Sequence, residues 1–141
     1  MALAIPVNPM PDQLPQGVRT ATITKNLDLT TAAASFTIDT RPAYSAIVSL
    51  EVELASTLTA ATAVKFGIGT ASDPDAYYLS AGLTTASNKY TILTHADTNV
   101  AATETLKLSA CATDGSAAGT VGGGADDTVK VRITYFYLEG F

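Results

Sequence analysis

The run Val129–Leu138 near the end of the chain constrains the fold more than any other stretch. It reads VKVRITYFYL, so β-branched or aromatic residues fill every second position, with Lys130 and Arg132 between the first of them. Alternation of this kind predicts a β-strand. The second face becomes apolar at Phe136 and Leu138, so both faces and both backbone edges need partners. We therefore expect a central strand and not a terminal tail.

Seven further segments carry strand signals, and none shows a convincing helical pattern. They are 19–24 with an extension through Leu27 and Leu29, 35–39, 44–54, 64–69, 77–83, 89–95 and 105–113. Short amphipathic strands at this spacing predict an all-β fold, an eight-stranded antiparallel β-sandwich with jelly-roll topology. The first and last strands of a jelly roll pair with each other. An eight-stranded up-and-down barrel is the alternative that the sequence leaves open.

The segment 44–54 predicts which of its side chains face the core. Strict alternation places Tyr44, Ala46 and Val48 on the same face as the later leucine and valine positions. Ile47 is the apolar exception on the other face. We therefore expect the first three side chains to point inward.

Glycine and aspartate mark the connections between strands. Gly67 and Gly69 lie on one face of their strand and predict a bend or the close approach of another backbone. The sequence Ser-Asp-Pro-Asp at 72–75 predicts a turn. The Gly-rich segment 114–127 predicts a flexible loop that is long enough to suggest a role of its own.

The chain of 141 residues predicts one sandwich domain, residues 19–141, preceded by an extended arm, residues 1–18. Four of the six prolines lie in this arm, and proline disfavours both helix and central strand. The arm also holds apolar residues that are unusual in a disordered tail, so a disordered leader and an arm lying on a neighbouring subunit both remain open. These residues are Leu3, Ile5, Val7, Met10 and Leu14.

Composition argues against several classes of function. Eight basic against 13 acidic residues give a net charge of -5, which does not provide the basic surface that nucleic acid or an anionic membrane requires. No apolar run approaches the roughly 20 residues of a membrane-spanning helix, and we expect no signal peptide. Only 15% of residues are charged, which suits a surface covered by other surfaces.

Individual residues do not form a recognisable catalytic or metal-binding pattern. His95 is the single histidine, and the nearby Asp97 alone does not complete a nucleophile–base arrangement. Cys111, the single cysteine, is expected to be a small, partly buried residue, and one histidine and one cysteine make a zinc site improbable. We therefore expect no metal and no cofactor.

The remaining polar and aromatic candidates have structural explanations. The paired carboxylates Glu51 and Glu53 resemble a glycosidase pair, but a solvated sheet face explains them better. The aspartate pairs at 73 and 75 and at 126 and 127 do not match a calcium loop, and the glycines at 122–124 lack the ending of a phosphate loop. Most of the six tyrosines fall on predicted core faces, so core packing is favoured over a sugar-stacking platform.

The order of these features resembles one class of known proteins. A Pro-rich arm precedes a Thr- and Ala-rich sandwich, FGIGTASDPDAYYLSAGL at 66–83 is followed by a strand pair and a Gly-rich loop, and VKVRITYFYLEGF ends the chain. In this style the chain is similar to β-sandwich structural proteins of tailed-bacteriophage virions, particularly jelly-roll head decoration (cement) proteins.

The resemblance implies a non-enzymatic protein that is made in the host cytoplasm and binds the outer surface of the phage head. Its implied partners are the major capsid protein and itself, as a homotrimer, without nucleic acid or membrane. The predicted contacts with these partners are Leu3, Ile5, Val7, Met10, Leu14, Phe136, Leu138 and Phe141. The alternatives are a tail, neck or head-fibre component, a carbohydrate-binding sandwich for host recognition and, more distantly, a hydrolase.

Overall fold

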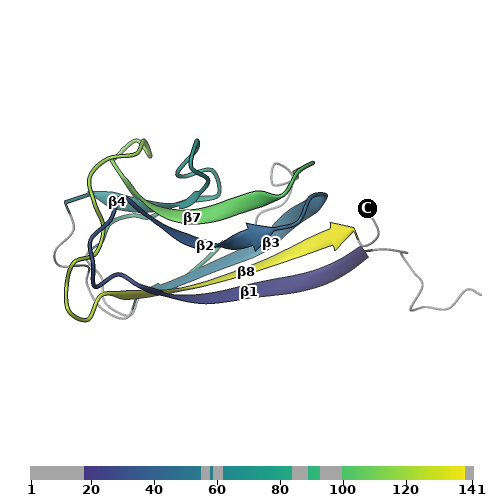
Figure 1. Cartoon of the computed structure of the whole chain (residues 1–141), viewed down its shortest axis with the longest axis horizontal. Helices are drawn as coiled ribbons and strands as arrows, with labels where there is room; N and C mark the ends of the chain where they lie inside the picture. The colour runs from purple at the N-terminus through teal and green to yellow at the C-terminus, as the bar shows by residue number, and fades with distance from the viewer. Residues whose placement is uncertain (1–17, 55–57, 59–61, 84–88, 93–99, 139–141) are drawn as a thin grey trace, which may run out of the picture.

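A computed structural model describes residues 18–54, 58, 62–83, 89–92 and 100–138 of the chain. The described residues form β-strands and no helix, which confirms the predicted all-β class (Figure 1). The strands are β1 (Val18–Asp28), β2 (Ser35–Arg41), β3 (Ser45–Leu54), β4 (Lys65–Gly69), β5 (Tyr78–Leu79), β6 (Lys89–Ile92), β7 (Glu104–Cys111) and β8 (Thr128–Leu138).

The strands pair in two antiparallel sheets that lie one above the other (Figure 1). One sheet has the order β1-β8-β3-β6 and the other has the order β2-β7-β4-β5. Successive strands therefore alternate between the sheets, except at β4 and β5, which are neighbours in one sheet. The up-and-down barrel is wrong, because a barrel of that kind pairs each strand with the next one along the chain.

Strand β8 is central, as its sequence predicts. It pairs with β1 without a break from Val18 opposite Leu138 to Asp28 opposite Thr128, so the predicted pairing of first and last strands is confirmed. Its other edge pairs with β3. Long pairing on both edges satisfies the backbone polar groups of this strand. It also brings the start of β1 and the end of β8 to the same end of the molecule (Figure 1).

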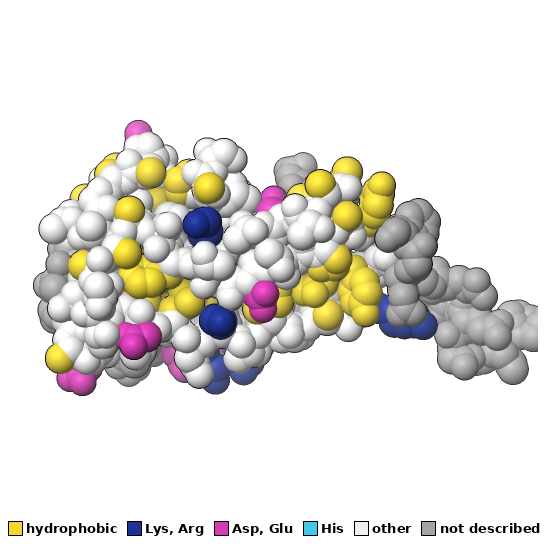
Figure 2. Space-filling model, in the orientation of Figure 1, with side chains coloured by type: hydrophobic (Ala, Val, Ile, Leu, Met, Phe, Trp, Pro, Cys, Tyr) yellow, Lys and Arg dark blue, Asp and Glu magenta, His cyan; other side chains and the backbone are white. Residues whose placement is uncertain are grey.

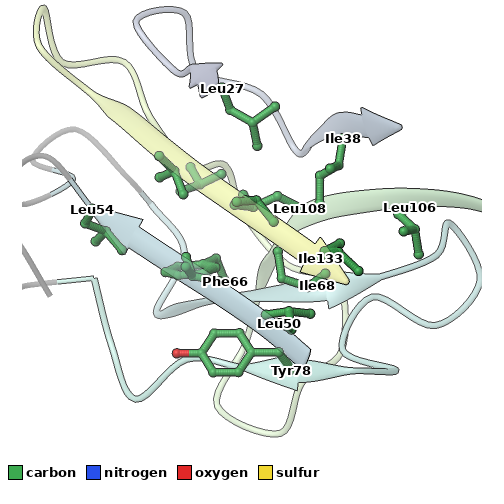
Figure 3. Packing of buried hydrophobic residues seen from close by; sticks show 14 of the residues in the cluster. Leu27, Ile38, Leu50, Leu54, Phe66, Ile68, Tyr78, Leu106, Leu108 and Ile133 are labelled. Carbon is green, nitrogen blue, oxygen red and sulfur yellow. The ribbon is translucent and has the colours of Figure 1, made fainter. Parts of the chain in front are cut away.

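The core lies between the two sheets and is built from the inward face of each strand (Figure 3). Val129, Val131 and Ile133 of β8 are buried, as the alternation predicts. Phe66 and Ile68 of β4 meet them from the other sheet, and both are fully buried. Burying a side chain of this size contributes roughly 1.5–3 kcal/mol relative to leaving it in water. The sandwich therefore depends on these facing layers.

The predicted inward face of β3 is wrong in its first half. A register shift in the pairing of β3 with β8 lies between Ile47 and Ser49, where one extra residue forms a β-bulge. Because side-chain direction alternates along a strand, one extra residue reverses the faces. Ile47 is fully buried, whereas Tyr44 is 47% exposed and Ala46 is only partly buried.

A second bulge redirects a charged residue in β2. The pairing of β2 with β7 shifts between Thr37 and Asp39. Beyond this point Arg41, at the end of the strand, turns inward and is completely buried. The sequence indicates only that Arg41-Pro42 interrupts a strand, and it does not indicate where the guanidinium group lies.

The glycines of β4 admit another backbone, as predicted. A Cβ atom built on Gly67 would lie 2.6 Å from the carbonyl oxygen of Pro74, and one on Gly69 would lie 2.7 Å from the amide nitrogen of Ala76. The 70–76 segment turns back over the strand, with the amide of Thr70 donating to the carbonyl of Asp73 at 2.9 Å. The predicted turn is therefore confirmed.

The Gly-rich segment 114–127 is anchored at its centre to the sandwich. Val121 is fully buried and exchanges backbone hydrogen bonds of 2.9 and 3.2 Å with Ala33. The amide of Gly123 donates to the carbonyl of Leu29 at 2.7 Å. Gly122 has a φ of 88°, a left-handed conformation that glycine adopts readily. The segment therefore closes one end of the core.

The predicted strand 77–83 is shorter in the structure, and the predicted strand 89–95 is described only in part. Only Tyr78–Leu79 of the segment 77–83 forms a strand. The segment 89–95 contributes Lys89–Ile92, and residues 93–95 lie outside the described part of the chain.

We expect Gly69→Ala to destabilise the fold by about 2 kcal/mol, because overpacking against a fixed backbone has a cost of this size. Its Cβ atom would meet Asp73 and Ala76, which the turn holds in place. Urea denaturation measures the effect, with Ala71→Ser, an exposed position in the same turn, as the control. Equal midpoints for the two variants would contradict the close approach.

Candidate functional site

An apolar groove lies where β8 ends and β3 begins. It encloses about 560 Å³ and is lined by Tyr44, Ser45, Ala46, Val100, Ala101, Phe136, Tyr137 and Leu138. Phe136 pairs directly with Ala46 across the two strands, and the amide of Leu138 donates to the carbonyl of Tyr44 at 3.2 Å. Hydrophobic side chains are also visible near this end of the molecule (Figure 2). The groove is a candidate docking surface.

Two large aromatic side chains in the groove are open to solvent. Among the described residues, the exposed large hydrophobic side chains are Tyr44, Phe136 and Val64, with exposures of 47%, 46% and 57%. Two of these three therefore belong to one groove. Exposed apolar surface that gathers in one place marks interaction sites more often than single exposed residues do.

The backbone of Tyr44 adopts a conformation that is unusual for its residue type. Its φ is 56°, in the left-handed region, and it is the one residue other than glycine with a positive φ among the described residues. The amide of Tyr44 donates to the carbonyl of Val100 at 2.7 Å. Strained backbone of this kind persists where its surroundings fix it, and it often occurs at functional sites.

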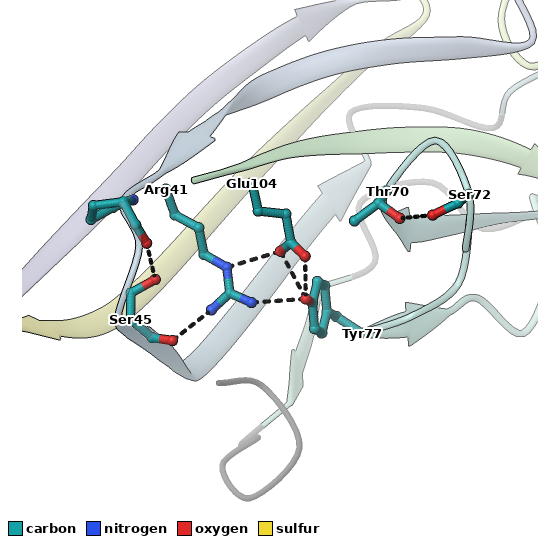
Figure 4. A network of polar contacts seen from close by, with 7 residues as sticks. Arg41, Ser45, Thr70, Ser72, Tyr77 and Glu104 are labelled. Carbon is teal, nitrogen blue, oxygen red and sulfur yellow. Dashed lines mark hydrogen bonds and ion pairs between the residues drawn. The ribbon is translucent and has the colours of Figure 1, made fainter. Parts of the chain in front are cut away.

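A buried polar network fixes the corner next to the groove, where the chain turns from the end of β2 at Arg41 to the start of β3 at Ser45 (Figure 4). The Nε of Arg41 donates to an Oε of Glu104 at 2.9 Å, and its Nη1 donates to the carbonyl of Ser45 at 3.3 Å. The hydroxyl of Tyr77 accepts from Arg41 at 2.8 Å and donates to Glu104 at 2.7 Å. The hydroxyl of Ser45 closes the turn by donating to the carbonyl of Pro42 at 2.7 Å. The network therefore ties β2, β3 and β7 together.

The network also changes the acidity of Tyr77. Burial, reinforced by the hydrogen bond to Glu104, raises the pKa of Tyr77 to about 12. Arg41 opposes this rise because its positive charge favours the phenolate. The guanidinium group also lies over the ring of Tyr77, 5.1 Å from the centroid. The phenol therefore stays protonated at neutral pH and serves as a hydrogen-bonding link.

The predicted contact residues fall into two groups. Phe136 is exposed and Leu138 is half-buried, and both line the groove. The others, Leu3, Ile5, Val7, Met10, Leu14 and Phe141, lie outside the described residues. Sequence reasoning does not indicate Tyr44, Val100 or Ala101 as groove residues, and the bulge in β3 explains why alternation places Tyr44 in the core.

Of the other polar candidates from the sequence, three in the described part of the chain pair with neighbouring groups or are buried. Glu51 forms an ion pair with Arg132 at 3.4 Å across the outer face of the sheet. A carboxylate oxygen of Asp127 accepts from the amide of Gly124 at 2.9 Å, which closes a turn. Cys111 is fully buried, and burial raises the pKa of its thiol. His95 lies outside the described residues.

The tyrosines do not form a shared platform among the described side chains. Tyr135 is buried in the core, as the alternation in its strand predicts, and Tyr78 is buried there as well. Tyr77 belongs to the polar network, Tyr137 packs against the edge of the core, and Tyr44 lies in the groove.

Neither a metal-binding cluster nor a membrane span is present in the described part of the chain. No group of three or more His, Cys, Asp or Glu residues there is arranged to hold a metal ion. No helix there is long and apolar enough to cross a bilayer.

Comparison with known proteins identifies the fold and no family. No protein-family model matches the chain, and no curated protein matches it. A chain of the cyanophage Pam1 capsid asymmetric unit is 18% identical, with a TM-score of 0.53, over 97% of this chain and 94% of that one. A chain of the Ralstonia phage GP4 capsid is 16% identical, with a TM-score of 0.51, over 96% and 92%. The likeness shows a shared fold.

We expect Tyr77→Phe to change how stability depends on alkaline pH. The pKa of Tyr77 rises from 10.0 in the unfolded chain to about 12 in the folded one, so only the folded state keeps this proton between those values. This contribution to stability is complete below pH 10 and is lost as the pH rises to 12. Urea denaturation across this range should show a smaller decline for the variant. Parallel declines would contradict the assignment.

We expect Tyr44→Val to be less stable than Tyr44→Asn by about 1 kcal/mol, because a left-handed backbone penalises β-branched residues and tolerates asparagine. Both variants remove the same ring, so each controls for its loss. Denaturation midpoints measure the difference. Equal stability would mean that Tyr44 is not held at a positive φ.

Proposed function

We propose that the chain is a non-enzymatic structural protein of a bacteriophage virion. The observation that carries this proposal is the fold shared, over nearly the whole chain, with two chains from phage capsid structures. The likeness spans 97% and 96% of this chain. Because one fold hosts many functions, the surface of the molecule must also support the role.

The sheet topology supports a jelly roll in the strict sense. The orders β1-β8-β3-β6 and β2-β7-β4-β5 place the first and last strands side by side in one sheet. The second and seventh strands lie side by side in the other sheet. Two Greek-key halves folded together produce this arrangement.

Within the virion, we assign the chain to the outer surface of the head, as a decoration protein that stabilises contacts between capsid subunits. Its partners are the major capsid protein and two further copies of itself. Few charges and many small side chains suit close contact between subunits.

The contacts with these partners are assigned to the arm and to the end of β8. Phe136 and Leu138 supply exposed or half-buried apolar surface in the groove. The arm residues Leu3, Ile5, Val7, Met10 and Leu14, together with Phe141, extend this surface on assembly. A partner that binds only the assembled shell stabilises it by about 2.7 kcal/mol per site at a concentration 100 times its Kd.

Binding to expanded phage heads that lack the chain tests this proposal. We expect saturable binding at a number of sites set by the capsid lattice, together with a higher temperature of head disruption. Deleting residues 2–16 should weaken binding, because it removes the arm's apolar contacts. Electron microscopy of the reconstituted particles locates the chain.

The control is the Val64→Ser variant, which removes an exposed hydrophobic side chain outside the groove. It should bind heads like the unaltered chain. Binding only at the tail or neck would favour the tail, neck or head-fibre role. Failure to bind particles, with binding to a glycan array, would favour the carbohydrate-binding role.

A further inference from the structure

The groove beside Tyr44 and Phe136 is built before any partner arrives. The network around Arg41 fixes the corner through the carbonyl of Ser45, and the bridge to Val100 fixes the backbone of Tyr44. A groove fixed in advance loses little conformational freedom on binding. Exposed aromatic side chains on such a rigid base are typical of sites that receive an apolar ligand.

The chemistry of the groove restricts its ligand to an uncharged segment. None of the described residues that line it carries a charge. Aromatic-lined grooves of this kind receive proline-rich segments, which keep an extended shape without internal hydrogen bonds. A ligand of this type would cover the rings of Tyr44 and Phe136 without burying an unpaired charge.

The chain itself contains a segment of this chemistry. Residues 5–11 read IPVNPMP, with three prolines and no charged residue. Pro6 and Pro9 are three residues apart, which matches one turn of a polyproline II helix. The segment and the groove are therefore complementary in polarity, since neither the segment nor the described lining of the groove carries a charge.

The place where the described chain begins puts this segment within reach. Val18 lies opposite Leu138, which lines the groove, and β3 lies one strand further on. Two strand spacings are roughly 10 Å. The six residues 12–17 span up to roughly 20 Å when extended. A tether of this length also gives an effective concentration on the order of millimolar.

We propose that, in the unassembled subunit, the groove lined by Tyr44, Ala46, Phe136 and Leu138 binds the proline-rich segment 5–11 of the same chain. The segment shields the exposed aromatic rings of the isolated subunit from water. This inference concerns the isolated subunit and does not rest on the proposed function.

A spin label on the arm of the full-length chain tests the proposal. Val7→Cys provides the attachment point, and the fully buried Cys111 is shielded from the reagent. Amide NMR signals of Ala46, Ala101 and Phe136 should be selectively lost, whereas that of Gly124, in the loop at 114–127, should remain. Reduction of the label should restore the lost signals.

A mixed sample distinguishes the subunit's own arm from that of a second copy. Isotope-labelled chain without the spin label is mixed with spin-labelled chain at natural isotope abundance. We expect all signals to be retained, because the label then lies on another molecule. Loss of the groove signals in this mixture would overturn the proposal in favour of exchange between copies.

Substitutions in the groove complete the test. Phe136→Ser combined with Tyr44→Asn should abolish the signal loss at Ala46 and Ala101, because both exposed rings are removed. Val64→Ser, which removes a similar exposed side chain elsewhere, should leave the loss unchanged. No selective loss in the unaltered groove, or a loss that persists in the double variant, would overturn the proposal.

Discussion

The pairing of β8 along both of its edges is the constraint on which the rest of the structure depends. One edge pairs with β1 over the full length of the strand, and the other pairs with β3. This arrangement satisfies the backbone of a long, largely apolar strand and places Val129, Val131 and Ile133 over the opposite sheet. It also brings the start of β1 and the end of β8 together, and the groove lies beside them.

Two bulges determine what this end of the sandwich presents. The bulge in β2 turns Arg41 into the interior, and the bulge in β3 turns Tyr44 and Ala46 toward the surface. Each inserts one residue, which reverses the faces of the strand beyond it. The buried cation of Arg41 and the exposed ring of Tyr44 are thus only three positions apart in the chain. The groove and the network are two consequences of the same irregularities.

The strands could be predicted from sequence because alternation is a local property. The predicted segments 44–54 and 129–138 match the observed strands Ser45–Leu54 and Thr128–Leu138 to within one residue at each end. The bulges could not be predicted from sequence. A period-two pattern continues past the extra residue, and nothing in the sequence shows that inward and outward side chains change places there. Alternation therefore indicates only part of the groove lining: it places Phe136 and Leu138 on a second apolar face of their strand, whereas it places Tyr44 in the core.

The Arg41 network could not be predicted either, but for a different reason. Arg41 and Glu104 are 63 residues apart, and only the sheet pairing brings them together. Removing a cation from water has a cost that its ion pair often only offsets, so the pair is weak evidence for added stability. Its geometric effect is clearer, because the same guanidinium group holds the carbonyl of Ser45. The network therefore contributes mainly by fixing the shape of the corner, and a groove of fixed shape is what an extended apolar segment requires.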